Sequence, residues 1–171
     1  MTGTTYAEQQ QSTAASHLAG KYLTFELGGE TYGLEILKVQ EIISMQEITK
    51  VPRTPEYVKG VINLRGKVIP VIDLRTKFEM QEVEATRDTC IIIVQVQRGE
   101  TSVIIGVIVD KVSEVLEISG EEIEPPPALG THVDTQFILG MAKTRDSVKI
   151  LLDIDKVMTE GEMESLARAS G

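Results

Sequence analysis

Few side chains in this sequence have the types and the spacing that catalysis or metal binding requires. The two histidines, His17 and His132, lie far apart, in a polar N-terminal stretch and in the loop after a run of prolines. The single cysteine, Cys90, precedes the apolar run 91–94, where we expect a packed thiol rather than a reactive one. Because there is no cysteine pair, HExxH motif, calcium-type acidic loop or phosphate-binding loop, we expect no metal, no cofactor and no catalytic residues.

Two acidic pairs are the remaining candidates for catalysis. Glu121 with Glu122, or Asp153 with Asp155, could in principle supply the two carboxylates of a glycoside hydrolase. Solvated acids near a loop or a helix start explain both pairs more simply. With three Phe, four Tyr and no Trp, the chain also lacks the usual stacking platforms for sugars and bases. The sequence does not favour an enzyme, while an acid-pair hydrolase and a small-ligand or carbohydrate-binding barrel stay open as alternatives.

The other charged residues could help to recognise another protein. The best candidates for such an interface are charges that stand among apolar residues. Arg65 lies at the tip of an expected hairpin, where its guanidinium can reach a carboxylate or stack on a partner. Glu41, inside the aliphatic stretch 39–43, is the natural acidic partner to test. A solvated turn residue and an ordinary exposed glutamate are the simpler alternatives.

β-strands are the elements that must position these residues. The chain has 18 Ile and 17 Val, and β-branched side chains favour strands over helices. Alternating apolar residues and glycine turns predict strands at 21–27, 31–36, 61–64, 68–74, 90–96, 101–109, 112–118, 137–141 and 148–152.

The segments between these strands carry weaker signals. Apolar spacing over 37–45 indicates one or two helical turns, and Pro70 predicts that its strand lies at an edge or a bulge. Residues 119–130, acidic and proline-rich, are predicted to form a stiff exposed loop. The spacing of apolar residues over 155–169 predicts a terminal helix.

The chain contains an internal duplication. The segment 32–43 aligns without gaps with 105–116, with matching glycine, lysine, valine and glutamate positions. A second alignment places Gly60, Arg65 and Asp73 opposite Gly140, Arg145 and Asp153. Two similar β units follow, each with about five short strands that suit a small closed barrel. A single long sandwich is the alternative.

Charge and hydropathy restrict the partners and the location. The net charge of −9, from 26 acidic and 17 basic residues, would repel a phosphate backbone, so we expect no nucleic-acid partner. Residues 1–20 are polar and are predicted to be a disordered leader rather than a signal peptide. The longest apolar stretch, 103–109, is too short to insert into a membrane, and a lone cysteine suits the cytoplasm.

Three segments, 32–42, 60–75 and 106–116, resemble CheW, the bacterial chemotaxis coupling protein family. The likeness runs from about Tyr22 to Met158, and the Asn-Leu-Arg-Gly block followed by Pro-Val-Ile-Asp-Leu carries it. The resemblance implies an all-β fold of two SH3-like five-stranded β-barrel subdomains related by duplication, with a short C-terminal helix. We expect a leader at 1–20, a CheW-like domain at 21–158 with a changeover near 79–90, and a helical tail at 159–171. Whether terminal strands are exchanged between the two lobes is left open.

The resemblance also implies a function and a set of binding residues. Such proteins are non-catalytic adaptors that tie the cytoplasmic tips of transmembrane chemoreceptors to the regulatory domain of the histidine kinase CheA. The expected location is therefore the cytoplasm, at the inner face of the membrane through the receptors. Receptor binding is expected at Val39, Glu41, Gly60, Asn63 and Arg65, and kinase binding at Val112 and Val115. The second copy keeps only Gly140 and Arg145 of the motif, so we expect no second receptor site there.

Overall fold

The computed structural model describes residues 18–126, 136–144, 147–158 and 161–162. The leader over 1–17, His17, His132 and most of the expected C-terminal helix lie outside the described residues. Strands account for most of the regular structure in the described part of the chain, with only short helical turns besides, so the predicted all-β fold class is confirmed.

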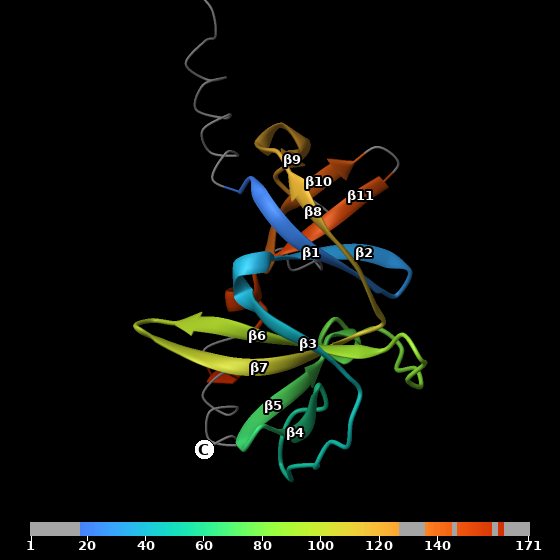
Figure 1. The fold of residues 1–171 in the computed structure, drawn as a ribbon, viewed down its shortest axis with the longest axis vertical. Coiled ribbons are helices and arrows are strands. Elements are labelled where there is room, and N and C mark those ends of the chain that lie inside the picture. The colour runs from blue at the N-terminus through green and yellow to red at the C-terminus, as the bar shows by residue number, and fades with distance from the viewer. Residues whose placement is uncertain (1–17, 127–135, 145–146, 159–160, 163–171) are drawn as a thin grey trace, which may run out of the picture.

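Two sheets make up the fold, one above the other in Figure 1. The six-stranded sheet has the order β8 (Lys111–Ile118), β1 (Gly20–Leu27), β2 (Glu30–Glu35), β11 (Ser147–Leu152), β10 (Ile138–Thr144) and β9 (Ile123–Glu124). The five-stranded sheet has the order β3 (Val39–Ser44), β6 (Cys90–Arg98), β7 (Thr101–Val109), β5 (Lys67–Asp73) and β4 (Val58–Leu64). The sixth strand of the larger sheet, β9, adds to the five that were expected.

The two sequence copies exchange strands between the sheets. In Figure 1 the blue strands β1 and β2 lie beside the orange and red strands β10 and β11. The parallel pairings β2–β11 and β5–β7 join the two copies, whereas the other strand pairs are antiparallel. The chain passes between the sheets at 36–38 and at Asp110. The connection near 79–90, expected as the changeover, instead joins two strands of the five-stranded sheet, because each sheet combines strands of both copies.

Matching hydrogen bonds show that the copies are structurally equivalent. The Asp73 N–H donates to the Tyr57 carbonyl at 2.8 Å, and the Asp153 N–H donates to the Phe137 carbonyl at 2.8 Å. The Asp73 and Asp153 carboxylates each accept from the backbone N–H two residues on, at 2.9 and 3.1 Å. Asp73 thereby caps α2 (Leu74–Lys77) and Asp153 caps η3 (Ile154–Lys156). Both contacts recur at positions that the sequence duplication aligns.

Three apolar clusters fill the interior. A central cluster lies between the sheets and takes residues from both, while each sheet also covers a smaller cluster of its own. Strand β6 shows the alternation: Ile92 and Val94 belong to the central cluster, and Ile91 and Ile93 belong to the cluster of the five-stranded sheet. Because both faces of β6 are buried, its sequence is a continuous apolar run rather than an alternating one.

The helical turns predicted over 37–45 are largely wrong. Only Ile36–Lys38 form a 3₁₀ turn, η1, and β3 begins at Val39. A register shift between Val39 and Glu41 interrupts the alternation of β3. A bulge of this kind changes the phase of the apolar positions, which then imitate helical spacing.

Pro70 does not lie on an edge strand, because β5 is flanked by β7 and β4. Pro70 is opposite Val61, and the parallel pairing with β7 starts one residue later, at Val71. In an antiparallel pair, hydrogen-bonded and non-hydrogen-bonded residue pairs alternate. Counting from the hydrogen-bonded pair Leu64–Lys67 at the turn, the pair Val61–Pro70 is a non-hydrogen-bonded one. The missing N–H therefore removes no bond to β4.

The segment after β8 is more ordered than the predicted loop. Gly120–Glu122 form a 3₁₀ turn, η2, and Ile123–Glu124 pair with β10 as β9. Ser119 donates its N–H to Glu122 at 2.9 Å, and Ile123 is buried among the residues of the six-stranded sheet. The capping contact and this one buried apolar side chain outweigh the acidic composition.

Candidate functional site

The tip of the β4–β5 hairpin presents Arg65. Arg65 and Gly66 have φ angles of 51° and 87°, which gives the two-residue turn whose twist matches the flanking strands. The Asn63 side chain accepts a hydrogen bond from the Gly66 N–H at 2.8 Å. Asn63 therefore holds the turn in shape, and the turn directs the Arg65 side chain outward.

Arg65 forms an ion pair with Glu41, as expected. The Arg65 guanidinium Nη2 donates to Glu41 Oε1, and the two side chains are 72% and 30% exposed. Glu41 belongs to β3 and Arg65 follows β4, the two edges of the five-stranded sheet. The pair therefore joins the edges of a curled sheet, and its exposure limits its stabilising effect to less than about 1 kcal/mol.

Gly60 allows the backbone of Thr49 to pack closely against β4. The backbone N–H and carbonyl of Thr49 bond to Val61, both at 2.8 Å, which brings the chain after β3 against β4. A Cβ at Gly60, where φ is 142°, would lie 2.1 Å from the Thr49 carbonyl oxygen. Gly60 is buried, so it positions β4 and offers no side chain to a partner, and its part in receptor binding stays a prediction.

The hairpin and the edge strand that carry this ion pair also expose apolar side chains, which sequence reasoning missed. Val68 is opposite Asn63 in the hairpin and is 49% exposed, and Ile42 of β3 is 44% exposed. Val39, in contrast, is half-buried and packs against the central cluster. Only the paired register shows which face each strand leaves open, and the sequence alone does not give that register.

The expected kinase-binding residues lie on the other sheet. Val112 and Val115 are both in β8, an edge strand that pairs with β1. Val115 is 48% exposed, whereas Val112 is half-buried against the central cluster. Val115 pairs with Leu23 and Val112 pairs with Phe25, on the two sides of a bulge in the β1–β8 ladder. The structure thus places the candidate receptor site and the candidate kinase site on separate sheets.

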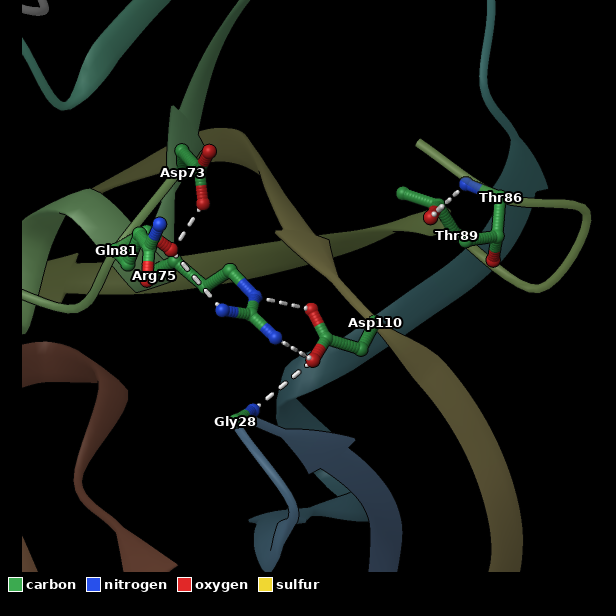
Figure 2. A network of polar contacts seen from close by, with 7 residues as sticks. All are labelled: Gly28, Asp73, Arg75, Gln81, Thr86, Thr89 and Asp110. Atoms are coloured by element: carbon green, nitrogen blue, oxygen red, sulfur yellow. Dashed lines mark hydrogen bonds and ion pairs between the residues drawn. The ribbon is translucent and has the colours of Figure 1, made fainter. Parts of the chain in front are cut away.

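A polar network that sequence reasoning missed lies where the chain passes from β7 to β8 (Figure 2). The Arg75 guanidinium donates from Nε to Asp110 Oδ1 and from Nη2 to Asp110 Oδ2, both at 2.7 Å. The Gly28 N–H, at the β1–β2 turn, donates to Asp110 Oδ2 at 2.9 Å. The hydrogen bond from Arg75 lowers the pKa of the Asp110 carboxyl, and the same contact raises the pKa of Arg75. Arg75 and Asp110 both lie in segments that carry the family resemblance, 60–75 and 106–116, but nothing in the sequence pairs them with each other.

The side chains considered for catalysis or metal binding have structural surroundings where the structure describes them. Among the described residues, no group of three His, Cys, Asp or Glu side chains could hold a metal ion. Of the acidic pairs considered for hydrolysis, Glu122 caps η2, Asp153 caps η3, and Asp155 binds Lys38 at 2.7 Å. Burial raises the pKa of the Cys90 thiol, which keeps it in the unreactive protonated form.

Comparison with known proteins shows the family of the chain. The family model described as CheW-like domain matches residues 21–162. The chain belongs to the CheW-like family. It is 39% identical over 153 residues to the chemotaxis protein CheW of Klebsiella aerogenes, covering 86% of this chain and 90% of that protein. It is 33% identical to the chemotaxis protein CheW of Treponema pallidum, covering 85% of each chain.

A solved CheW structure has the same fold. The crystal structure of the scaffolding protein TtCheW from Thermoanaerobacter tengcongensis matches with a TM-score of 0.74 and 42% identity, over 84% of this chain and 95% of that one. The family resemblance and the two-subdomain fold expected from the sequence are therefore confirmed. In the part of the chain that the structure describes, no helix has the length and apolar character needed to span a bilayer.

Proposed function

We propose that this protein is a non-catalytic chemotaxis adaptor that couples transmembrane chemoreceptors to the histidine kinase CheA. The observation that carries the proposal is the separation of the candidate binding residues. The Glu41–Arg65 pair is on the five-stranded sheet, and Val115 is on β8 of the six-stranded sheet. Two partners can therefore bind one copy at the same time. Receptor binding would recruit the adaptor to the inner face of the cytoplasmic membrane.

The receptor side combines charge with apolar surface. Arg65 and Glu41 present both signs of charge, and the exposed Val68 and Ile42 lie on the same hairpin and edge strand. A helix bundle that exposes alternating charged and aliphatic residues, as expected of a receptor tip, complements such a surface. The exposed charges on this surface provide orientation, and the apolar neighbours provide most of the binding free energy.

The kinase side offers a sheet edge. β8 pairs on one side with β1, and its exposed Val115 lies among charged residues such as Glu114 and Glu117. The CheA regulatory domain is expected to have the same fold, so its own barrel can pack an apolar end against this strand. An exposed valine in a charged setting suits a reversible, moderately sized interface.

Two matched pairs of variants test the proposal. Arg65→Glu should weaken the binding of a receptor cytoplasmic fragment at least about tenfold, while Arg87→Glu, at an exposed position in the 79–89 connection, should bind normally. Val115→Glu should weaken binding to the CheA regulatory domain, while Val148→Glu, 50% exposed on the same sheet, should not. Isothermal calorimetry and circular dichroism report affinity and fold.

A competition titration tests the bridge itself. If the adaptor joins the two partners, adding receptor fragment to the adaptor–kinase complex forms a ternary complex that size-exclusion chromatography detects. Displacement of the kinase domain by the receptor fragment, or wild-type binding by Arg65→Glu, would refute the assignment.

A further inference from the structure

Two polar clasps connect the sheets at the places where the chain crosses between them. The first clasp consists of Gly28, Arg75 and Asp110, and the second consists of Lys38, Gln97 and Asp155. In the second, Lys38 Nζ donates to Asp155 Oδ2 at 2.7 Å and the Gln97 N–H donates to Asp155 Oδ1 at 2.7 Å. In each clasp, one carboxylate binds one cation and one backbone N–H from a hairpin end.

The clasps are pseudo-symmetric, with the charges exchanged. Arg75 and Asp155 occupy equivalent positions after β5 and β11, in the alignment that also pairs Asp73 with Asp153. Asp110 and Lys38 lie on the two crossovers. The duplication aligns Asp110 with Leu37, so Lys38 is one residue beyond the equivalent position. The acid stands on the crossover in the first clasp and after the strand in the second.

The first clasp makes more hydrogen bonds than the second. Arg75 contacts Asp110 through two parallel hydrogen bonds, and its Nη1 also donates to the Gln81 carbonyl at 3.0 Å (Figure 2). The Asp110 N–H donates to the Glu26 carbonyl at 3.1 Å. The Arg75 and Asp110 side chains are only 18% and 27% exposed, so solvent screens the pair less than it screens Glu41–Arg65. The clasp fixes the start of β8 relative to the end of β5 and to the β1–β2 turn.

We propose that Arg75 and Asp110 are positioning residues that hold the β8 surface in a fixed orientation to the five-stranded sheet, so that occupancy of one surface affects the other. The proposal rests on the proposed function, because it assigns the receptor to one sheet and the kinase to the other. A signal between such sites must cross the contact between the sheets. The central cluster supplies the cohesion of that contact, but apolar packing is non-directional. The bidentate clasp supplies a defined direction.

The first measurement needs no partner. Nitroxide labels at Lys67→Cys on the hairpin and Ser113→Cys on β8, in a Cys90→Ala background, report the distance between the sheets by pulsed electron spin resonance. We expect Asp110→Asn to broaden or shift the distance distribution. Glu124→Gln, which removes the exposed Lys143 pair within one sheet, is the matched control and should leave it unchanged.

The second measurement is the coupling between partners. In the wild type, saturation with CheA regulatory domain should change the affinity for a receptor fragment by about fivefold or more, the usual range for coupled sites. In Asp110→Asn, each partner alone should bind within about twofold of wild type, but the coupling should fall below about twofold. The double variant Arg75→Asp/Asp110→Lys copies the charge order of the second clasp and should restore both the narrow distribution and the coupling.

The outcomes separate the two proposals. An unchanged distance distribution, or unchanged coupling, in a folded Asp110→Asn variant overturns the positioning role. Failure of the wild type to bind receptor fragment or kinase domain overturns the proposed function instead, while the distance measurement still decides whether the clasp orients the sheets. Thermal unfolding of every variant identifies any that do not fold. If Asp110→Asn does not fold, Arg75→Lys takes its place, because lysine keeps the charge but cannot make the two parallel hydrogen bonds of the guanidinium.

Discussion

Replacing Gly60 by alanine should damage the candidate receptor site from inside the protein. A Cβ at this position would approach the Thr49 carbonyl oxygen to 2.1 Å, so that backbone must move by about 1 Å to reach normal contact. The two Thr49–Val61 hydrogen bonds, both 2.8 Å, would be lost or stretched. At about 0.5–1.5 kcal/mol for each bond and about 1 kcal/mol for an unfavourable φ, we expect a loss of about 2–4 kcal/mol in the free energy of unfolding.

Gly66→Ala separates the steric clash from the backbone strain. Gly66 also has a positive φ, 87°, but a Cβ placed there would have no atom within 4 Å, so only about 1 kcal/mol should be lost. Urea unfolding gives the two free energies, and hydrogen exchange should show faster opening of the Thr49 and Val61 amides in Gly60→Ala alone. Equal destabilisation by the two substitutions, with unchanged exchange, would refute the close-approach explanation.

Three further results are expected. The contact with Arg75 lowers the pKa of the Asp110 carboxyl in the folded protein. Its stabilising effect is therefore complete above the unfolded pKa of an aspartate and is lost as the pH falls through the lower folded pKa. The urea midpoint of Asp110→Asn should accordingly depend less on pH in the acidic range than the midpoint of the wild type. Thr24→Val should cost about 1–2 kcal/mol, because the buried hydroxyl donates to the Glu114 carbonyl at 2.8 Å and accepts its N–H at 3.2 Å; a neutral effect in urea unfolding would contradict this. Cys90 should react with a thiol reagent at least about tenfold more slowly in the native protein than in urea, because burial raises its pKa; equal rates would show that the thiol is accessible.

Local chemistry made much of the fold predictable from the sequence. Three of the hairpins could be located because a glycine turn separates two apolar segments, at Gly28, Gly66 and Gly99. The alternation of apolar residues fails where a bulge changes its phase, which is why β3 imitated a helix. A single buried side chain such as Ile123 is also too weak a signal to indicate a two-residue strand.

Long-range pairing explains what could not be predicted. The contact between β2 and β11 joins Leu34 with Leu152, and nothing in either strand identifies its partner. The Arg75–Asp110 pair depends on the same kind of pairing, because the two residues come together only when β5 lies beside β7. The Glu41–Arg65 pair could be proposed because each charge stands among apolar residues and the family resemblance puts both residues in one binding region.

The exchange of strands gives the adaptor a mechanical property that two independent barrels on a linker would lack. Each sheet contains strands from both sequence copies, and the parallel pairs β2–β11 and β5–β7 connect them within the sheets. The two sequence copies therefore cannot separate without breaking backbone ladders, whereas the two sheets are held to each other by the central cluster, the two crossovers and the polar contacts beside them. Rotation of the sheets within that cluster breaks no ladder, and it is this motion that contacts at the crossovers, such as Arg75 with Asp110, oppose. A scaffold built in this way keeps its two sequence copies joined, while the contacts at the crossovers set the orientation of its two surfaces to each other.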